Sequence, residues 1–170
     1  MNEFLRAASS MRNGIEQVFE KLHAVPEGPF AETKTAVFIA SRLADEGFRV
    51  RTGLAGTGVI ADLGPRQEVG IDQGACPSGP APAVLALRAD MDAMLHSVGD
   101  DEVYVHSCGH DAHSTMVLAA GVILARECPG ARGRLRLVFQ PAEETGLGAE
   151  RMIQAGAVEG VDAMFGIHLR

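Results

Sequence analysis

The sequence lacks the features that mark several large classes of protein. Only 15 of its 170 residues are Lys or Arg, against 22 Asp and Glu, and the net charge of −7 gives no basic surface for nucleic acid. The longest nearly unbroken apolar run, Met116–Ala125, is about half of a membrane span, and the N-terminus has no signal-peptide core. Three widely spaced cysteines do not form a disulfide framework. We therefore expect neither a nucleic-acid nor a membrane partner, and a cytoplasmic location.

Several familiar catalytic and nucleotide-binding motifs are also missing. There is no Walker loop, no H-E-x-x-H and no G-x-S-x-G sequence. The segment Gly56–Ala61 matches the dinucleotide fingerprint G-x-G-x-x-A, but that fingerprint requires a helix to begin there. Its apolar residues instead run directly into Gly64 and Pro65. We interpret the segment as a tight turn between two strands.

Alternating helix and strand patterns predict the fold. Apolar residues recur at helical spacing over Phe4–Leu22 and Ala36–Leu43, with Gly47 where the second helix would end. The segment Thr115–Ala125 is apolar on nearly all sides, which is typical of a deeply buried helix. A short helix is expected at Ala149–Gln154, and strands at Phe48–Arg51, Thr57–Leu63, Val84–Leu87, Leu135–Phe139 and Met164–Ile167. We expect an α/β fold, a three-layer sandwich with a mixed, largely parallel sheet flanked by helices.

Side chains that bind metal ions gather in four short segments at the ends of predicted strands. The segments are Arg88–Asp92, His106–His113, Gln140–Glu144 and Gly166–His168. Sites in open α/β sheets form where strands end. Cysteine, histidine and carboxylate together suit Zn²⁺ or a similar first-row ion, and mixed ligation is compatible with Mn²⁺ and Co²⁺. The sequence therefore predicts a metal site at these strand ends.

Each of these residues also has a plainer explanation when it is taken alone. We expect His113 to face solvent in the first turn of the buried helix, and Asp111 to act as the N-cap of that helix. Asp90 and Asp92 fall on one side of a strand and are equally compatible with a solvated strand end. A lone cysteine such as Cys108 is usually a small buried hydrophobe. The metal-site hypothesis therefore depends on the convergence of all four segments.

Eight stretches, in order along the chain, resemble the metal-dependent N-acyl-amino-acid amidohydrolases, the branch that contains hippurate hydrolase and plant auxin-conjugate hydrolases. The stretches are LHAVPE, ETKTA, GTGVIADLG, ALRADMDAM, HSCGHDAHS, GRLRLVFQPAEE, GAERMIQAG and VDAMFGIHL. HSCGHDAH and FQPAEE together are highly specific. The resemblance implies that Glu143 is the general base and that Asp92 supports the ligands from behind. It also implies two divalent ions, Mn²⁺ or Zn²⁺ with Co²⁺ also compatible, held by Cys108, His110, Glu144 and His168.

The same resemblance implies that the chain is part of a larger enzyme. Residues 1–170 would form the N-terminal portion of a catalytic domain, with the lid and dimerisation domain and a last histidine ligand outside this chain. The full-length form would be a homodimer. Two stretches depart from the family: Met94–Val105 is short and different, and the Gly- and Pro-rich loop Gly64–Pro82, which holds Cys76, is longer. Since the first stretch helps to shape the family's pocket, the acyl group and the amino acid of the substrate stay open.

Three functions are compatible with these residues. The first is metal-dependent hydrolysis of the amide bond of an N-acyl or N-aroyl amino acid, a small-molecule substrate, to a carboxylic acid and an amino acid. One of the adjacent Glu143 and Glu144 would bind metal while the other moves a proton from water to the leaving amine; spacing does not rank them, and their order comes from the resemblance. The second is a thiol hydrolase with Cys108 as nucleophile and His110 or His113 as base. The third is a truncated fragment that binds metal without catalysis.

Overall fold

The computed structural model describes residues 3–64, 83–129, 131 and 133–169. Its helices are α1 (Glu3–Ser10), α2 (Arg12–His23), α3 (Thr33–Asp45), α4 (His110–Glu127) and α5 (Gly148–Gln154). Its strands are β1 (Arg49–Leu54), β2 (Gly58–Leu63), β3 (Val84–Asp90), β4 (Met94–Val98), β5 (Asp101–Val105), β6 (Arg134–Gln140) and β7 (Ala163–Gly166). Apart from Gly64, the predicted loop up to Pro82 lies outside the described residues, as does Cys76. Among the described helices, none is long and apolar enough to cross a membrane.

Five strands form one mixed sheet in the order β1-β2-β6-β3-β7. A tight turn at Gly56 joins β1 to β2, which are antiparallel, and β2 also runs antiparallel to β6. The pairs β6–β3 and β3–β7 are parallel. The predicted α/β fold with a mixed sheet is confirmed, but its parallel part is limited to three strands because the turn reverses the chain after β1. The interpretation of the dinucleotide-like segment as a turn between strands is confirmed as well.

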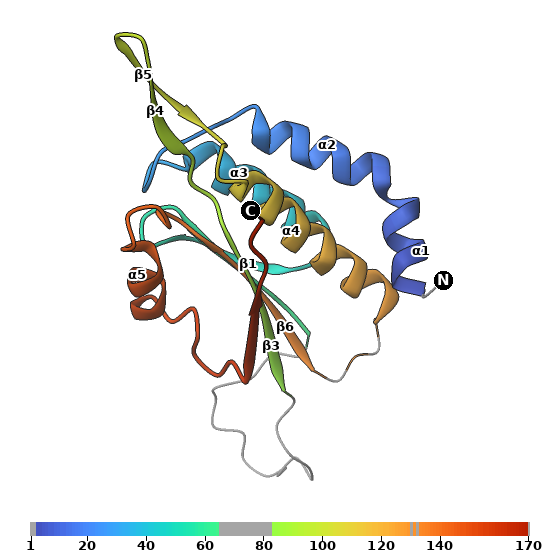
Figure 1. The fold of residues 1–170 in the computed structure, drawn as a ribbon. Coiled ribbons are helices and arrows are strands. Elements are labelled where there is room, and N and C mark those ends of the chain that lie inside the picture. The colour runs from blue at the N-terminus through green and yellow to red at the C-terminus, as the bar shows by residue number, and fades with distance from the viewer. Residues whose placement is uncertain (1–2, 65–82, 130, 132, 170) are drawn as a thin grey trace.

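Helices cover both faces of this sheet, so the predicted three layers are present. Figure 1 shows α1 to α4 on one face and α5 on the other. Successive residues of a strand point to opposite faces, and the central strands are apolar on both. Val59 and Leu137 join the large core under α2, α3 and α4, whereas Ile60 and Val138 pack against Met152 of α5. Burial on both faces explains why these strands read as continuous apolar runs.

The buried helix α4 lies close against the sheet. It begins at His110, earlier than the apolar run alone predicts, and it is preceded by Gly109 with a φ of +81°. A Cβ atom on Gly121 would lie only 2.4 Å from Cδ1 of the fully buried Leu137, so a larger residue there would force that side chain to move. This close packing brings the N-terminus of α4 to the ends of the strands.

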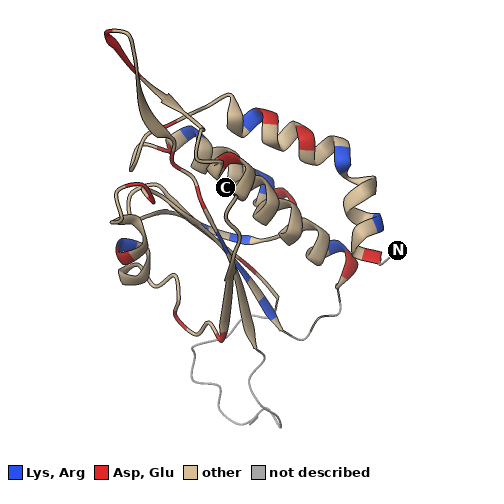
Figure 2. Cartoon of the chain, viewed as in Figure 1, with Lys and Arg blue, Asp and Glu red and all other residues tan. Residues whose placement is uncertain are grey.

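Two local features differ from the sequence expectation. The N-terminal apolar stripe forms two helices, α1 and α2, which are separated at Met11 and both pack against α4. The stretch 94–105 forms a hairpin, β4–β5, that makes its own two-stranded sheet and projects from the body (Figure 1). Most of its residues are exposed, and acidic residues lie at its tip (Figure 2). Because neither face of the hairpin is buried, its sequence carries no alternation that would have predicted it.

Candidate metal centre

The parallel pair β3 and β6 brings the polar segments together. Asp90, the last residue of β3, lies opposite Gln140, the last residue of β6. Because parallel strands end at the same edge of a sheet, the segments that follow them leave side by side. The N-terminus of α4 reaches the same edge, and Asp92 accepts a hydrogen bond from His110 there. Residues far apart in the sequence therefore form one polar cluster at this edge.

His110 lies at the centre of the cluster and is fully buried. Its Nδ1 is 3.0 Å from the backbone oxygen of Asp92 and 3.2 Å from Asp92 Oδ1. Since both partners only accept, Nδ1 carries a proton, and Nε2 is the ring nitrogen left to bind a metal ion. That Nε2 has no hydrogen-bond partner among the described residues, although Glu143 Oε2 lies 3.7 Å away and Glu144 Oε1 lies 3.8 Å away. A buried, oriented and unpartnered imidazole nitrogen is typical of a metal ligand.

Cys108, His110 and Glu144 offer one thiol, one imidazole and one carboxylate as a group. Their ligand atoms all lie within 4.8 Å of one another. The Cys108 sulfur is also 3.6 Å from the backbone oxygen of Asp92. This donor set suits Zn²⁺ and related first-row ions. The residues present therefore fit a divalent metal ion, and three of the four predicted ligands belong to this group.

Burial and hydrogen bonds together perturb the titration of these groups. Burial by itself would raise the pKa of the Cys108 thiol, but the nearby His106 and His110 outweigh it and bring that pKa to about 7. Burial likewise disfavours protonated His110, yet Asp92 and Cys108 raise its pKa to about 10. Burial also disfavours the Asp92 carboxylate, but His110 and two backbone N–H groups hold its pKa below its usual value. A divalent cation bound at Nε2 of His110 would thus replace the second proton of that imidazole.

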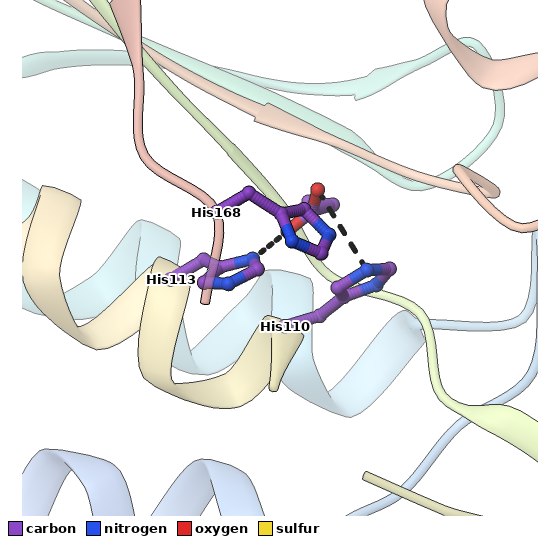
Figure 3. A group of neighbouring side chains, drawn as sticks. His110, His113 and His168 are labelled. Atoms are coloured by element: carbon purple, nitrogen blue, oxygen red, sulfur yellow. Dashed lines mark hydrogen bonds and ion pairs between the residues drawn. The ribbon is translucent and has the colours of Figure 1, made fainter. Parts of the chain in front are cut away.

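A second group of possible ligands lies beside the first and shares His110. Its members offer ligand atoms within 4.8 Å of one another and are Asp90, His110, His113 and His168. Figure 3 shows His110 and His113 on α4, facing His168 from the segment after β7. The His168 side chain is exposed, and its ring centroid lies 4.5 Å from that of His113. His168 therefore lies near the cluster, but in a different group from Cys108 and Glu144.

His113 is buried, so the expectation that it faces solvent is wrong. Its Nδ1 lies 2.6 Å from Asp90 Oδ1, and its Nε2 accepts the backbone N–H of Leu169 at 2.8 Å. The segment that covers His113 comes after β7 and is far from α4 in the sequence. Local sequence patterns therefore could not predict this burial. His113 thus connects β3 with the segment that carries His168.

Asp111 is not the N-cap of α4, which is Gly109. Its Oδ2 lies 2.6 Å from Nδ1 of His23, and its Oδ1 accepts the N–H of Ala112. The N-cap prediction is wrong because the glycine turn between Cys108 and His110 lets the helix start earlier. Asp111 instead connects α2 to the first turn of α4.

Asp90 at the end of β3 and Asp92 two residues later are both fully buried, so neither is a solvated strand end. Asp90 accepts a hydrogen bond from Arg88 at 2.7 Å and binds His113, and Arg88 also donates to Gln140. Asp92 instead faces the Glu143-Glu144 turn. The two carboxylates therefore bind different partners, although their spacing of two residues predicts that they lie on the same side of a strand.

Residues 86–170, half of the chain, match peptidase family M20/M25/M40. The chain is 34% identical over 167 residues to N-acetyl-L-cysteine deacetylase of Bacillus subtilis, an alignment that covers 94% of this chain and 37% of that protein. It is 37% identical over 156 residues to IAA-amino acid hydrolase ILR1-like 5 of Arabidopsis thaliana, with 88% of this chain and 33% of that protein covered. The chain thus spans about a third of the length of these curated relatives.

Solved structures agree with this match. The fold is similar to the YXEP protein of Bacillus subtilis, described as a dinuclear metal binding peptidase from the M20 family, with a TM-score of 0.77 and 28% identity over 95% of this chain and 44% of that chain. An aminobenzoyl-glutamate utilization protein from Klebsiella pneumoniae shares the fold with a TM-score of 0.77 at 24% identity, covering 99% of this chain and 46% of that one. The residues of both ligand groups fall within the matched range. The chain belongs to peptidase family M20/M25/M40.

Proposed function

We propose that residues 1–170 are the N-terminal portion of the catalytic domain of a larger metal-dependent amidohydrolase. Its reaction is hydrolysis of the amide bond of an N-acyl or N-aroyl amino acid to a carboxylic acid and an amino acid. Two curated relatives, a deacetylase of N-acetyl-L-cysteine and a hydrolase of IAA-amino acids, support this substrate class. The observation that carries the proposal is the buried, unpartnered Nε2 of His110 beside two carboxylates.

The proposed site holds two divalent ions, Mn²⁺ or Zn²⁺ with Co²⁺ also compatible. When bound, such ions supply a Lewis acid that polarises the scissile carbonyl and acidifies water. We assign Cys108, His110 and Glu144 to one ion, supported by the mutual distances of their ligand atoms. We assign His168 to the second ion, supported by its place beside His110.

Glu143 is the proposed general base. Its side chain is 37% exposed, so water and substrate can reach it, and its Oε2 faces the centre of the cluster. A carboxylate bound to a metal ion loses basicity, because the positive charge lowers its pKa. Glu144 as ligand and Glu143 as base therefore divide the work: Glu143 takes a proton from water and donates it to the leaving amine nitrogen. Asp92 fixes both residues through their backbone N–H groups.

The remaining parts of the proposal concern the whole protein. We propose a cytoplasmic enzyme that is a homodimer in its full-length form and that takes small-molecule substrates rather than nucleic acid or membrane. The relatives are about three times as long as this chain, so this 170-residue chain would bind metal without completing the catalytic site. Its activity is therefore best assayed in the full-length protein.

A thiol hydrolase is the second candidate, and the pKa of about 7 for Cys108 favours it, because a thiolate is the nucleophilic form. It leaves the Glu143-Glu144 pair and His168 without a role. Metal removal distinguishes the two candidates in the full-length protein. With a panel of N-acetyl and N-aroyl amino acids, a metal-dependent enzyme loses activity in EDTA and regains it with Mn²⁺ or Zn²⁺. A thiol enzyme retains activity in EDTA and loses it in iodoacetamide.

A further inference from the structure

Buried carboxylates hold three consecutive backbone N–H groups in the turn after β6. Asp92 accepts the N–H of Glu143 through Oδ1 and the N–H of Glu144 through Oδ2, each at 3.0 Å. Glu32 accepts the N–H of Ala142 at 2.8 Å. Asp92 belongs to the polar cluster, whereas Glu32 comes from the loop before α3, 110 residues earlier in the chain. The function proposed above gives Glu32 no role.

Glu32 is fully buried, and each of its oxygens accepts hydrogen bonds. Oε1 accepts the N–H of Phe30 at 3.1 Å as well as that of Ala142, and Oε2 accepts the hydroxyl of Thr57. A buried carboxylate with this many donors is rigidly held. Glu32 therefore connects the loop before α3, the start of β2 and the turn after β6.

The position of Glu32 would ordinarily give it a different task. It is the N-cap residue of α3, yet its side chain makes no capping hydrogen bond. Glu27 does that work instead, because its carboxylate accepts the N–H groups of Lys34 and Thr35 at 3.1 and 2.9 Å. Since α3 is capped by another glutamate, the side chain of Glu32 is free to reach the turn.

The turn itself needs an external support. Ala142 has a φ of +51°, a left-handed conformation that residues with a Cβ rarely adopt. The residue is also fully buried, so no water is available to its N–H group. The backbone conformation of Ala142 sets the direction in which the side chains of Glu143 and Glu144 project from the turn. Of the three consecutive N–H groups from Ala142 to Glu144, Glu32 holds the one that Asp92 does not hold.

We propose that Glu32 is a positioning residue for the Glu143-Glu144 pair. It contacts neither metal nor substrate; it fixes the backbone from which the proposed base and the proposed ligand project. This inference rests on the function proposed above for those two glutamates. It predicts that the site requires the length and the acceptor oxygen of the side chain at position 32, and that it does not require a negative charge there.

Two substitutions of Glu32 separate the effect of side-chain length from the effect of charge. Glu32→Gln keeps an oxygen at Oε1 for both backbone N–H groups, and its amide NH₂ can donate to the Thr57 hydroxyl, which then accepts. Glu32→Asp keeps the charge but withdraws the carboxylate by one methylene, which leaves the N–H of Ala142 without an acceptor. Glu27→Ala is the matched control, because it removes the cap of the same helix but leaves the turn untouched.

The test uses the full-length protein loaded with Co²⁺, whose spectrum reports the ligands around it. Glu32→Asp is expected to weaken Co²⁺ binding roughly tenfold, since a buried donor is left unpaired, to change the cobalt spectrum, and to lower kcat more than it raises KM. Glu32→Gln should stay within about twofold of the wild type in each measurement. Glu27→Ala should lower the melting temperature while its cobalt spectrum and kcat match the wild type.

The opposite ranking, with Glu32→Asp active and Glu32→Gln impaired, would overturn the proposal. A Glu32→Asp variant that, like the Glu27→Ala control, differs from the wild type only in melting temperature would also overturn it, because Glu32 would then have a purely structural role. Failure of the proposed reaction looks different. Wild-type protein that hydrolyses no N-acyl amino acid refutes the amidohydrolase assignment, while the cobalt spectra and affinities of the position-32 variants still decide whether Glu32 positions the turn.

Discussion

Replacing Asp92 by Asn tests the hydrogen bonding behind the metal centre. The Asp92 carboxylate is fully buried and accepts three hydrogen bonds, from Glu143, Glu144 and His110. An asparagine offers a single acceptor oxygen. If that oxygen occupies the Oδ1 position, it keeps the bonds to Glu143 and His110, and the NH₂ group then faces the N–H of Glu144. At least one buried donor is left unpaired.

An unpaired buried donor costs about 1–3 kcal/mol, which corresponds to a factor of about 5 to 150 in an equilibrium constant. The unpaired N–H group belongs to the proposed ligand Glu144. We therefore expect the metal dissociation constant of Asp92→Asn to rise by about 5- to 150-fold. Competition with a chromophoric chelator, with the full-length protein and Zn²⁺ at fixed pH, measures it. Asp62→Asn is the control, because Asp62 pairs with Arg136 away from the site. A dissociation constant for Asp92→Asn within twofold of the control would refute the reasoning.

The remaining predictions concern the ligands, the base and the protons they release. Glu143→Gln should keep metal while kcat falls by about 10²–10⁴, and Glu144→Gln should lose metal; metal analysis showing the reverse would exchange their roles. His113→Ala should release the segment after β7 and lower the number of bound ions per chain, whereas unchanged stoichiometry would contradict its connecting role. Metal binding displaces a proton from His110, whose pKa is about 10, and below pH 7 also from Cys108, whose pKa is about 7. Apparent affinity should therefore rise about tenfold per pH unit from 7 to 10, and more steeply below 7; a flat profile in a pH titration would show His110 neutral.

Most of the sheet could be predicted because its central strands are buried on both faces. Continuous apolar runs reveal such strands, and polar residues directly after them reveal the edge where a site forms. The hairpin β4–β5 had no such pattern, since most of its residues are exposed. The break at Met11 was also hidden, because the apolar stripe continues through it in the sequence.

The site could be predicted only as far as local sequence determines it. Cys108 and His110 lie in one short motif, and the family resemblance adds Glu144 as a third ligand. The burial of His113 depends on Leu169, and the role of Glu32 depends on Ala142, so both come from contacts between segments far apart in the chain. Neither periodicity nor residue spacing carries information about such pairs, and only the folded backbone reveals them.

The hairpin β4–β5 makes the site tolerant of changes in length. The chain leaves the cluster after Ala93 and returns at His106, and the first and last residues of the hairpin, Met94 and Val105, are paired directly. Added or deleted residue pairs would therefore lengthen or shorten the projecting tip while Asp92 and Cys108 stay where they are. Loop-closure entropy opposes such growth only weakly, about 0.6 kcal/mol for each doubling of length. A chain with a short hairpin can therefore keep the positions of Asp92 and Cys108, while the part of the pocket that the hairpin shapes changes.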